Sequence, residues 1–327
     1  MLALSALQLE RKSKALPTST SLSLYQWAIH LLVPLLHKRS TLTLASCVIL
    51  CVFEMSSCSP KAWRRHLDGC ASLIMALDIR GDQGGIEQSL FWCFARMDVC
   101  GALISSERTL IPIDRWITSA SSDTIHGQHR FPTVDFEDHA SHVCYLLAKV
   151  LSLINGPRSV PPRNGVQRSD LQGNMKPEGW HGLFNELEAW YRGLPTEMTA
   201  ILSIPTDPTS TTNPFHTLMF SSGAAVAGNQ LYHTAMLLML AVKPKEVSVE
   251  SRSRLWHARQ ICAITISNDH HGAWTNSIQP VWLAGQLMSS PVEHRAIINL
   301  YERIERDTGW GATWRVKDLQ AHWGDLT

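Results

Sequence analysis

Two histidines and two aspartates come close together in one stretch of the sequence. His139 and His142 stand three residues apart, and Asp135 and Asp138 come just before them. On a helix this spacing puts both imidazoles on one face, where they could begin a metal site. However, the spacing supplies no third ligand, and a solvated polar face opposite the Val143 side of the helix explains the same residues. We therefore predict no metal site here.

A second pair of imidazoles, His270 and His271, follows Asn268 and Asp269 at the end of an expected helix. Imidazoles at this place suit the negative end of the helix dipole. That interpretation accounts for the pair without a catalytic or metal role.

The eight cysteines do not predict a zinc site either. Six of them fall within apolar helical patterns, where a free cysteine behaves as a small buried hydrophobic residue. Cys51 and Cys58 form a loose pair, but no Cys-x-x-Cys is present and no second pair stands at ligand spacing.

Sequence signatures of common enzymes are missing as well. The chain contains no Gly-x-Ser-x-Gly, no phosphate-binding Gly-x-x-x-x-Gly-Lys, no Gly-x-Gly-x-x-Gly and no His-Glu-x-x-His. It also lacks an Asp-Asp pair for magnesium-bound diphosphates. We predict that the protein is not an enzyme and has no catalytic, cofactor-binding or metal-binding residues.

The elements that would position these side chains are helices. The organising stretch runs from Ser59 to Trp116, with one amphipathic helix starting at Pro60 and a second, apolar on nearly every face, starting near Glu87. The second helix should be central to a bundle. It contains Arg96 and Asp98, which must find partners or reach the surface because unpaired buried charge is costly.

The rest of the sequence predicts an all-α fold of about ten helices around one core, in a single domain of residues 1–327. Pro34 is expected to kink or end a helix, and a capping box starts at Ser290. The other helical patterns cover about 1–11, 41–55, 135–154, 177–193, 215–242 and 249–267. Residues 156–177 are rich in Pro, Gly and Arg, and they predict a flexible internal loop.

Composition narrows the class of partner. The apolar fraction is 45%, the charged fraction is 17% and the net charge is +1, which argues against a polybasic nucleic-acid surface over the whole chain. No run reaches the roughly 18–20 apolar residues of a membrane helix, so we predict no membrane contact. The twelve tryptophans follow helical stripes, which favours packing, although so apolar a core could enclose a small hydrophobic molecule.

Several blocks of the sequence, in order along the chain, resemble the regulatory domain of fungal binuclear zinc-cluster transcription factors. These blocks are ALSALQLER, LASCVILCVFEM, SPKAWRRHLDGCASLI, LFWCFARMDVCGALIS, IPIDRW, GWHGLFNELEAWYRGLP, YHTAMLLML, ICAITISNDHHGAWTNSIQPVWLAGQLM and YERIERDTGWGATWRVKDLQAHWG. Together they cover nearly the whole chain.

The resemblance implies a nuclear regulator of RNA polymerase II transcription. In that family the helical region modulates an N-terminal module that reads DNA and holds two zinc ions with six cysteines. This sequence has no such cysteine cluster and is expected to be N-terminally incomplete. We therefore expect DNA contact only through a module absent here and no DNA-binding residues in this chain. The expected partners are the transcription machinery or co-regulators, and a small hydrophobic effector. The alternative is a standalone helical ligand-binding or interaction protein without DNA binding.

Overall fold

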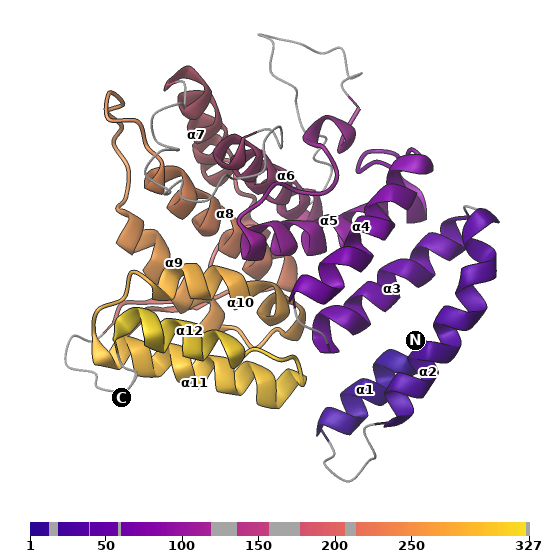
Figure 1. The fold of residues 1–327 in the computed structure, drawn as a ribbon. Helices are drawn as coiled ribbons and strands as arrows, with labels where there is room; N and C mark the ends of the chain where they lie inside the picture. Colours follow the sequence, from indigo (N-terminus) through magenta and orange to yellow (C-terminus); the bar gives the residue numbers. More distant parts are fainter. Residues whose placement is uncertain are drawn as a thin grey trace, which may run out of the picture. The chain divides into compact units, whose positions relative to one another are not determined.

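The computed structural model describes residues 1–12, 19–38, 40–57, 60–118, 136–156, 177–206 and 214–324. Within these ranges it contains twelve α-helices and one small two-stranded sheet (Figure 1). The predicted all-α class is confirmed, with two helices more than the approximate number expected. The contacts divide the chain into two compact units, and the single domain of residues 1–327 stays a prediction. Most of the predicted flexible loop, residues 157–176, lies outside the described residues.

The first unit comprises residues 1–104, 110–130 and 302–312. Its elements are α1 (Leu2–Lys12), α2 (Ser19–Leu32), the short 3₁₀ helix η1 (Val33–Lys38), α3 (Thr41–Ser57), α4 (Pro60–Ala76), α5 (Gly85–Ser105) and η2 (Ile113–Arg115). α1 packs on α2 and α3, and α3 also packs on α4. α2 ends two residues before Pro34, as the sequence predicts.

The second unit comprises residues 105–109, 131–301 and 313–327. Its elements are α6 (Phe136–Asn155), α7 (Pro177–Arg192), η4 (Thr196–Met198), β1 (Leu202–Ile204), β2 (Thr217–Met219), α8 (Gly223–Ala241), α9 (Arg254–Ser267), α10 (His271–Gly285), α11 (Pro291–Thr308) and α12 (Trp314–Trp323). The last turns of α11 belong to the first unit. α8 is its central helix and packs against α6, α9 and α10 (Figure 1).

A glycine allows α6 to come close to α8. A Cβ atom built on Gly228 would lie 2.6 Å from the Met198 methyl carbon and 3.6 Å from the Cα atom of Ala140. The Met198 methyl group, at the end of a flexible side chain, would have to move, whereas the distance to Ala140 is an ordinary van der Waals contact. Gly228 belongs to a run of small residues, 223–228, and such runs are typical of close helix contacts.

The helix predicted from residue 215 begins later, at Gly223. Residues 217–219 instead form β2, which pairs antiparallel with β1 so that Leu218 lies opposite Ser203. Polar side chains at the end of α9 hold this strand: Asn268 donates to the Leu218 carbonyl at 2.7 Å and accepts from the Phe220 amide at 3.0 Å. These partners lie about fifty residues away, so helical periodicity alone could not reveal them.

The charged residues inside α5 do find partners. Asp98 is fully buried, and its carboxylate accepts from the Leu110 amide at 2.8 Å and from the Ile111 amide at 3.1 Å. The Arg96 guanidinium donates to the Trp92 carbonyl at 3.1 Å. Asp98 thus fixes the segment that follows α5, as the cost of buried charge requires.

The predicted capping box is present at the start of α11. The Ser290 hydroxyl accepts from the Val292 amide at 3.3 Å, and the Glu293 carboxylate accepts from the Ser290 amide at 3.3 Å. We expect Ser290→Ala to lower the free energy of unfolding by about 1 kcal/mol, the usual effect of losing an N-terminal cap. Urea denaturation followed by circular dichroism measures this change. Ser289→Ala is the matched control, and an equal loss in both variants would contradict the assignment.

Candidate functional site

The first unit contains a cavity of about 430 Å³, which lies within the usual range for small-molecule sites, roughly 300–1,000 Å³. Four helices supply its lining: Leu7, Glu10 and Arg11 from α1, Ser21, Leu22 and Tyr25 from α2, Phe53, Glu54 and Ser57 from α3, and Ala62 and His66 from α4. The rings of Tyr25 and Phe53 stack with centroids 4.7 Å apart. The cavity thus combines an aromatic and aliphatic wall with several polar groups.

The carboxylate of Glu54 is buried in the cavity wall, and one of its two oxygens lacks a hydrogen-bond partner among the described residues. Its side chain is only 4% exposed. Atom Oε1 accepts from the Tyr25 hydroxyl and lies 2.9 Å from Nδ1 of His66. Atom Oε2 is buried and has no hydrogen-bond partner among the residues that the structure describes. Burial raises the pKa of Glu54, while the Tyr25 hydroxyl and the His66 ring act in the opposite direction.

Glu10, the second carboxylate at the cavity, is already satisfied. Its two oxygens accept from the Ser21 amide at 2.8 Å and the Ser21 hydroxyl at 2.5 Å. The hydroxyl bond holds the pKa of Glu10 below its ordinary value, so this residue is charged at neutral pH. The neighbouring Arg11 guanidinium donates to the Gly309 carbonyl. These contacts connect α1 to α2 and to the end of α11.

Sequence reasoning missed this site. Glu54 is the one charged residue in the otherwise apolar helix α3, and this was the available signal. A lone carboxylate in such a helix needs a partner. Its partners, Tyr25 and His66, come from two other helices, so only the fold brings the three side chains together.

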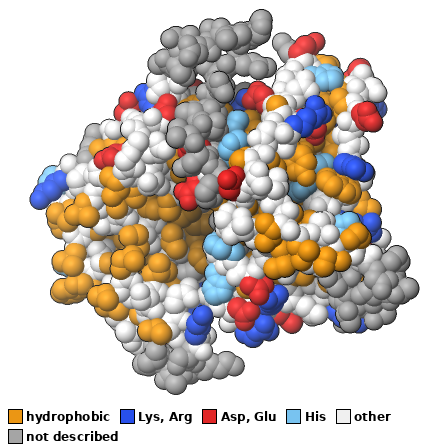
Figure 2. Space-filling view, turned by 180° about the vertical axis from the view of Figure 1, so that it is seen from behind, with side chains coloured by type: hydrophobic (Ala, Val, Ile, Leu, Met, Phe, Trp, Pro, Cys, Tyr) orange, Lys and Arg blue, Asp and Glu red, His pale blue; other side chains and the backbone are white. Residues whose placement is uncertain are grey.

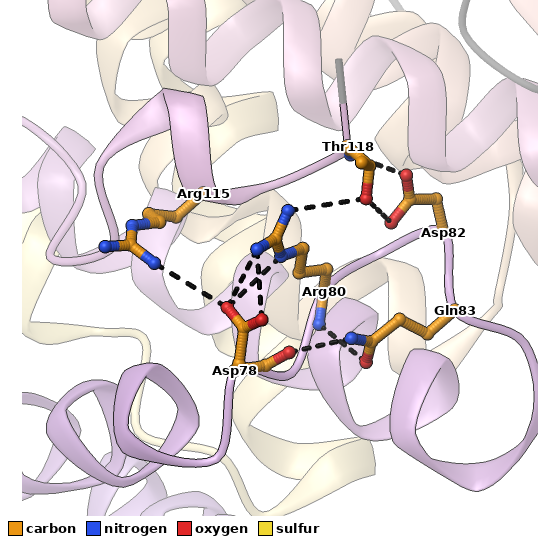
Figure 3. Close-up of polar contacts among 6 residues, drawn as sticks. All are labelled: Asp78, Arg80, Asp82, Gln83, Arg115 and Thr118. Carbon is orange, nitrogen blue, oxygen red and sulfur yellow. Dashed lines mark hydrogen bonds and ion pairs between the residues drawn. The ribbon is translucent and has the colours of Figure 1, made fainter. Parts of the chain in front are cut away.

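A polar network on the first unit connects the α4–α5 loop to the segment after η2 (Figure 3). Asp78 receives two bonds of 3.0 Å from the Arg80 guanidinium and lies 3.6 Å from Arg115. Asp82 accepts from the Thr118 amide at 2.5 Å and from its hydroxyl at 3.3 Å. Because these carboxylates already bond within the protein, the network fixes the loop and is a poor candidate for ligand binding.

The second unit contains a buried pair of histidines. His233 on α8 and His257 on α9 face each other with their Nδ1 atoms 3.0 Å apart. The rings of Tyr191, Tyr232 and Trp256 surround the pair. Burial lowers the pKa of His257 to about 4 and puts the pKa of His233 well below its ordinary value, with His257 as a further cause. Both rings are therefore neutral at pH 7.

The histidines singled out in the sequence are on α6. His139, His142 and Asp138 belong to this helix, whereas Asp135 lies outside the described residues. Burial lowers the pKa of His142 to about 4, and His139 and Lys149 contribute to the shift. Within the described ranges, no group of three or more His, Cys, Asp and Glu side chains is arranged to hold a metal ion.

The interpretation of His270 as a residue at a helix C-terminus is wrong. α9 ends at Ser267, and His270 is the N-terminal cap of α10, where its Nδ1 atom accepts from the Ala273 amide at 3.2 Å. His271 is the first residue of α10. A ring nitrogen can replace the usual hydroxyl or carboxylate cap because it offers a lone pair.

Cys51 and Cys70 lie buried against each other, with their sulfur atoms 3.4 Å apart, while Cys58 lies outside the described residues. Burial in the apolar interior is consistent with packing. No helix among the described residues has the length and hydropathy needed to cross a membrane.

The sequence was compared with known proteins and protein families. The model of the fungal specific transcription factor domain matches residues 1–322. The chain is 22% identical over 330 residues to the transcription activator AMTR1 of Alternaria alternata, an alignment that covers 84% of this chain and 43% of that protein. It is 23% identical over 158 residues to the uncharacterized protein AN5342 of Emericella nidulans, covering 46% of this chain and 34% of that protein. The aligned region is thus less than half of either relative, and no solved structure matches.

Proposed function

Because the chain belongs to the family of fungal specific transcription factor domains, we propose that it is the regulatory domain of a nuclear regulator of RNA polymerase II transcription. The observation that carries this proposal is the family match over residues 1–322. A relative described as a transcription activator supports it. The domain acts by binding other molecules, without catalysis and without reading DNA itself.

Exposed apolar side chains on the first unit support a role in protein contacts. Figure 2 shows patches of hydrophobic side chains on the face that it draws. The exposed large apolar residues of α2 and η1 are Leu22, Trp27, Leu31, Val33, Leu35 and Leu36. Trp27 is 64% exposed, which is unusual for so large an apolar side chain. A co-regulator protein with a complementary apolar surface is the partner that this helix face fits.

The function is tested by fusing the chain to a heterologous DNA-binding domain and measuring a reporter gene. We expect the fusion to change reporter output several-fold, up or down, and to localise in the nucleus. A fusion that folds but leaves the reporter unchanged would contradict the proposal.

We expect Trp27→Glu to reduce the reporter effect of this fusion at least two-fold, because a charge on α2 opposes the burial of an apolar surface in a protein contact. Ile201→Glu is the matched control, since Ile201 is 66% exposed and lies in the second unit. Immunoblotting for fusion protein level separates lost contact from lost protein. An equal reduction in both variants would argue against a contact at α2.

The second candidate is a standalone ligand-binding or interaction protein without DNA binding, which the cavity of the first unit favours. Such a protein would co-purify with a zinc-cluster transcription factor but leave the reporter unchanged in the fusion. Both candidates predict only nonspecific retention of promoter DNA at physiological salt. Specific retention would contradict both.

A further inference from the structure

We infer that the cavity of the first unit binds a small molecule with an apolar body and an amine, and that the amine donates to Oε2 of Glu54. If the ligand is an effector, its binding would be part of the proposed regulatory function, and the biological role of the site rests on that function. The binding itself depends only on the geometry of the cavity.

The unpartnered oxygen of Glu54 is the first argument. A buried carboxylate oxygen without a donor is destabilising, and nearly all buried polar atoms in proteins have a partner. Oε1 has two neighbours, the Tyr25 hydroxyl and the His66 ring, whereas Oε2 has none among the described residues. Glu54 lines the cavity, but Oε2 itself is buried, so a ligand amine reaches this atom only when the Glu54 carboxylate turns toward the cavity.

The charges around the cavity select a cationic donor. Among the described lining residues, Glu10 and Glu54 bring two carboxyl groups and Arg11 brings one guanidinium. The Arg11 guanidinium donates to Gly309, and His66 is engaged with Glu54. A ligand carboxylate would face two carboxyl groups, whereas an ammonium group would form a charge-assisted hydrogen bond.

The rest of the lining fits an apolar body. Leu7, Leu22 and Phe53 give apolar surface, and the stacked rings of Tyr25 and Phe53 form an aromatic wall. Burying an aromatic or alkyl group here is favourable because it removes apolar surface from water. The polar group sets the orientation, as is usual in small-molecule sites.

Three probes of similar size separate the possible occupants: 2-phenylethylamine, 2-phenylethanol and 3-phenylpropionate. We expect calorimetric titration of the whole chain to show binding of the amine at least ten-fold tighter than that of the carboxylate, with the alcohol between them. Preferred binding of the carboxylate would overturn the assignment, because a protonated Glu54 would then be the donor. Absence of binding by all three at millimolar concentration would also overturn it and leave water as the partner of Oε2.

Two variants locate the site. Glu54→Gln should weaken amine binding at least ten-fold and change alcohol binding less than three-fold. Leu22→Arg should also weaken amine binding at least ten-fold, since it adds a cation to the lining at a side chain that is already 51% exposed. Leu9→Arg is the matched control on an exposed residue outside the lining. Unchanged amine binding in Glu54→Gln and Leu22→Arg, with unchanged melting curves, would overturn the assignment. The titrations use the chain without the reporter fusion. The ligand-binding proposal and the proposed regulatory function can therefore fail independently.

Discussion

Replacing Asp98 with alanine is expected to lower the free energy of unfolding by about 4 kcal/mol, because two backbone amides lose hydrogen bonds to a charged acceptor, each contributing about 1.5–3 kcal/mol. The carboxylate is fully buried in α5 and accepts from Leu110 and Ile111. Asp98→Asn, which keeps the size but not the charge, should cost about 2 kcal/mol. Urea denaturation followed by circular dichroism and tryptophan fluorescence measures both values.

The effect of Asp98 should extend into the aromatic cluster of the first unit. The carbonyl of Ile111 accepts from the Trp116 indole at 3.1 Å, and the Trp116 ring packs edge-on against Phe91 and Trp92. Loosening residues 110–111 should therefore change tryptophan fluorescence as well as stability. Asp114→Ala is the control, since Asp114 is an exposed residue of η2. A loss below 1 kcal/mol in Asp98→Ala would contradict this account.

The sequence predicted the type and approximate position of most helices. Helix α5 is an instructive case: its apolar character predicted burial, and its two charged residues predicted that partners must exist. The sequence did not predict which residues these partners are, because any nearby backbone amide can donate a hydrogen bond to a carboxylate. Leu110 and Ile111 follow Asp98 by about a dozen residues, but only the course of the chain after α5 brings their amides to its carboxylate.

Two predictions were wrong where tertiary contacts outweighed a local pattern. Residues 217–219 follow a helical pattern but pair with β1 and bond to the end of α9. His270 follows a helix in sequence, yet it caps the next one. In both cases the deciding hydrogen bonds depended on where α9 ends, and element ends are the least certain part of a sequence pattern.

The cavity was not predicted from the sequence. The available signal was the single charged residue, Glu54, in the otherwise apolar helix α3. The aromatic wall of the cavity and the unpartnered Oε2 atom depend on how α1, α2 and α4 pack around α3. The same limit applies to His233 and His257, which are 24 residues apart in the sequence and meet only because α8 packs on α9.

Acidification from pH 7 to pH 5 is expected to lower the stability of the second unit, because His233 and His257 remain neutral in the folded state while the unfolded chain takes up protons. The pKa of His257 falls from an ordinary value of 6.5 to about 4, and that of His233 also lies well below 6.5. Between these values the unfolded state binds more protons, so the free energy of unfolding rises with pH. The stabilisation is complete above about pH 7 and decreases as the pH falls below 6.5.

The size of the effect follows from the same linkage. At pH 5 His257 should account for about 2 kcal/mol of lost stability, and His233 adds a loss in the same direction. Urea denaturation of the whole chain at pH 7, 6 and 5 measures the slope. Between pH 7 and pH 5 the double variant His233→Gln/His257→Gln should lose less unfolding free energy than the unsubstituted protein, by at least the amount given for His257. This holds whatever the stability of the variant at pH 7. His271→Gln, which changes an exposed ring of the same unit, is the control for general acid sensitivity.

The contact between the two rings gives a structural reason for this acid sensitivity. The Nδ1 atoms are 3.0 Å apart, so one must donate and the other accept. A proton on the accepting nitrogen removes this bond and brings two N–H groups face to face inside an aromatic shell of Tyr232 and Trp256. The folded state therefore resists protonation, and acid acts by populating the unfolded chain. An unchanged slope in the double variant would mean that other groups cause the loss and that this pair titrates normally.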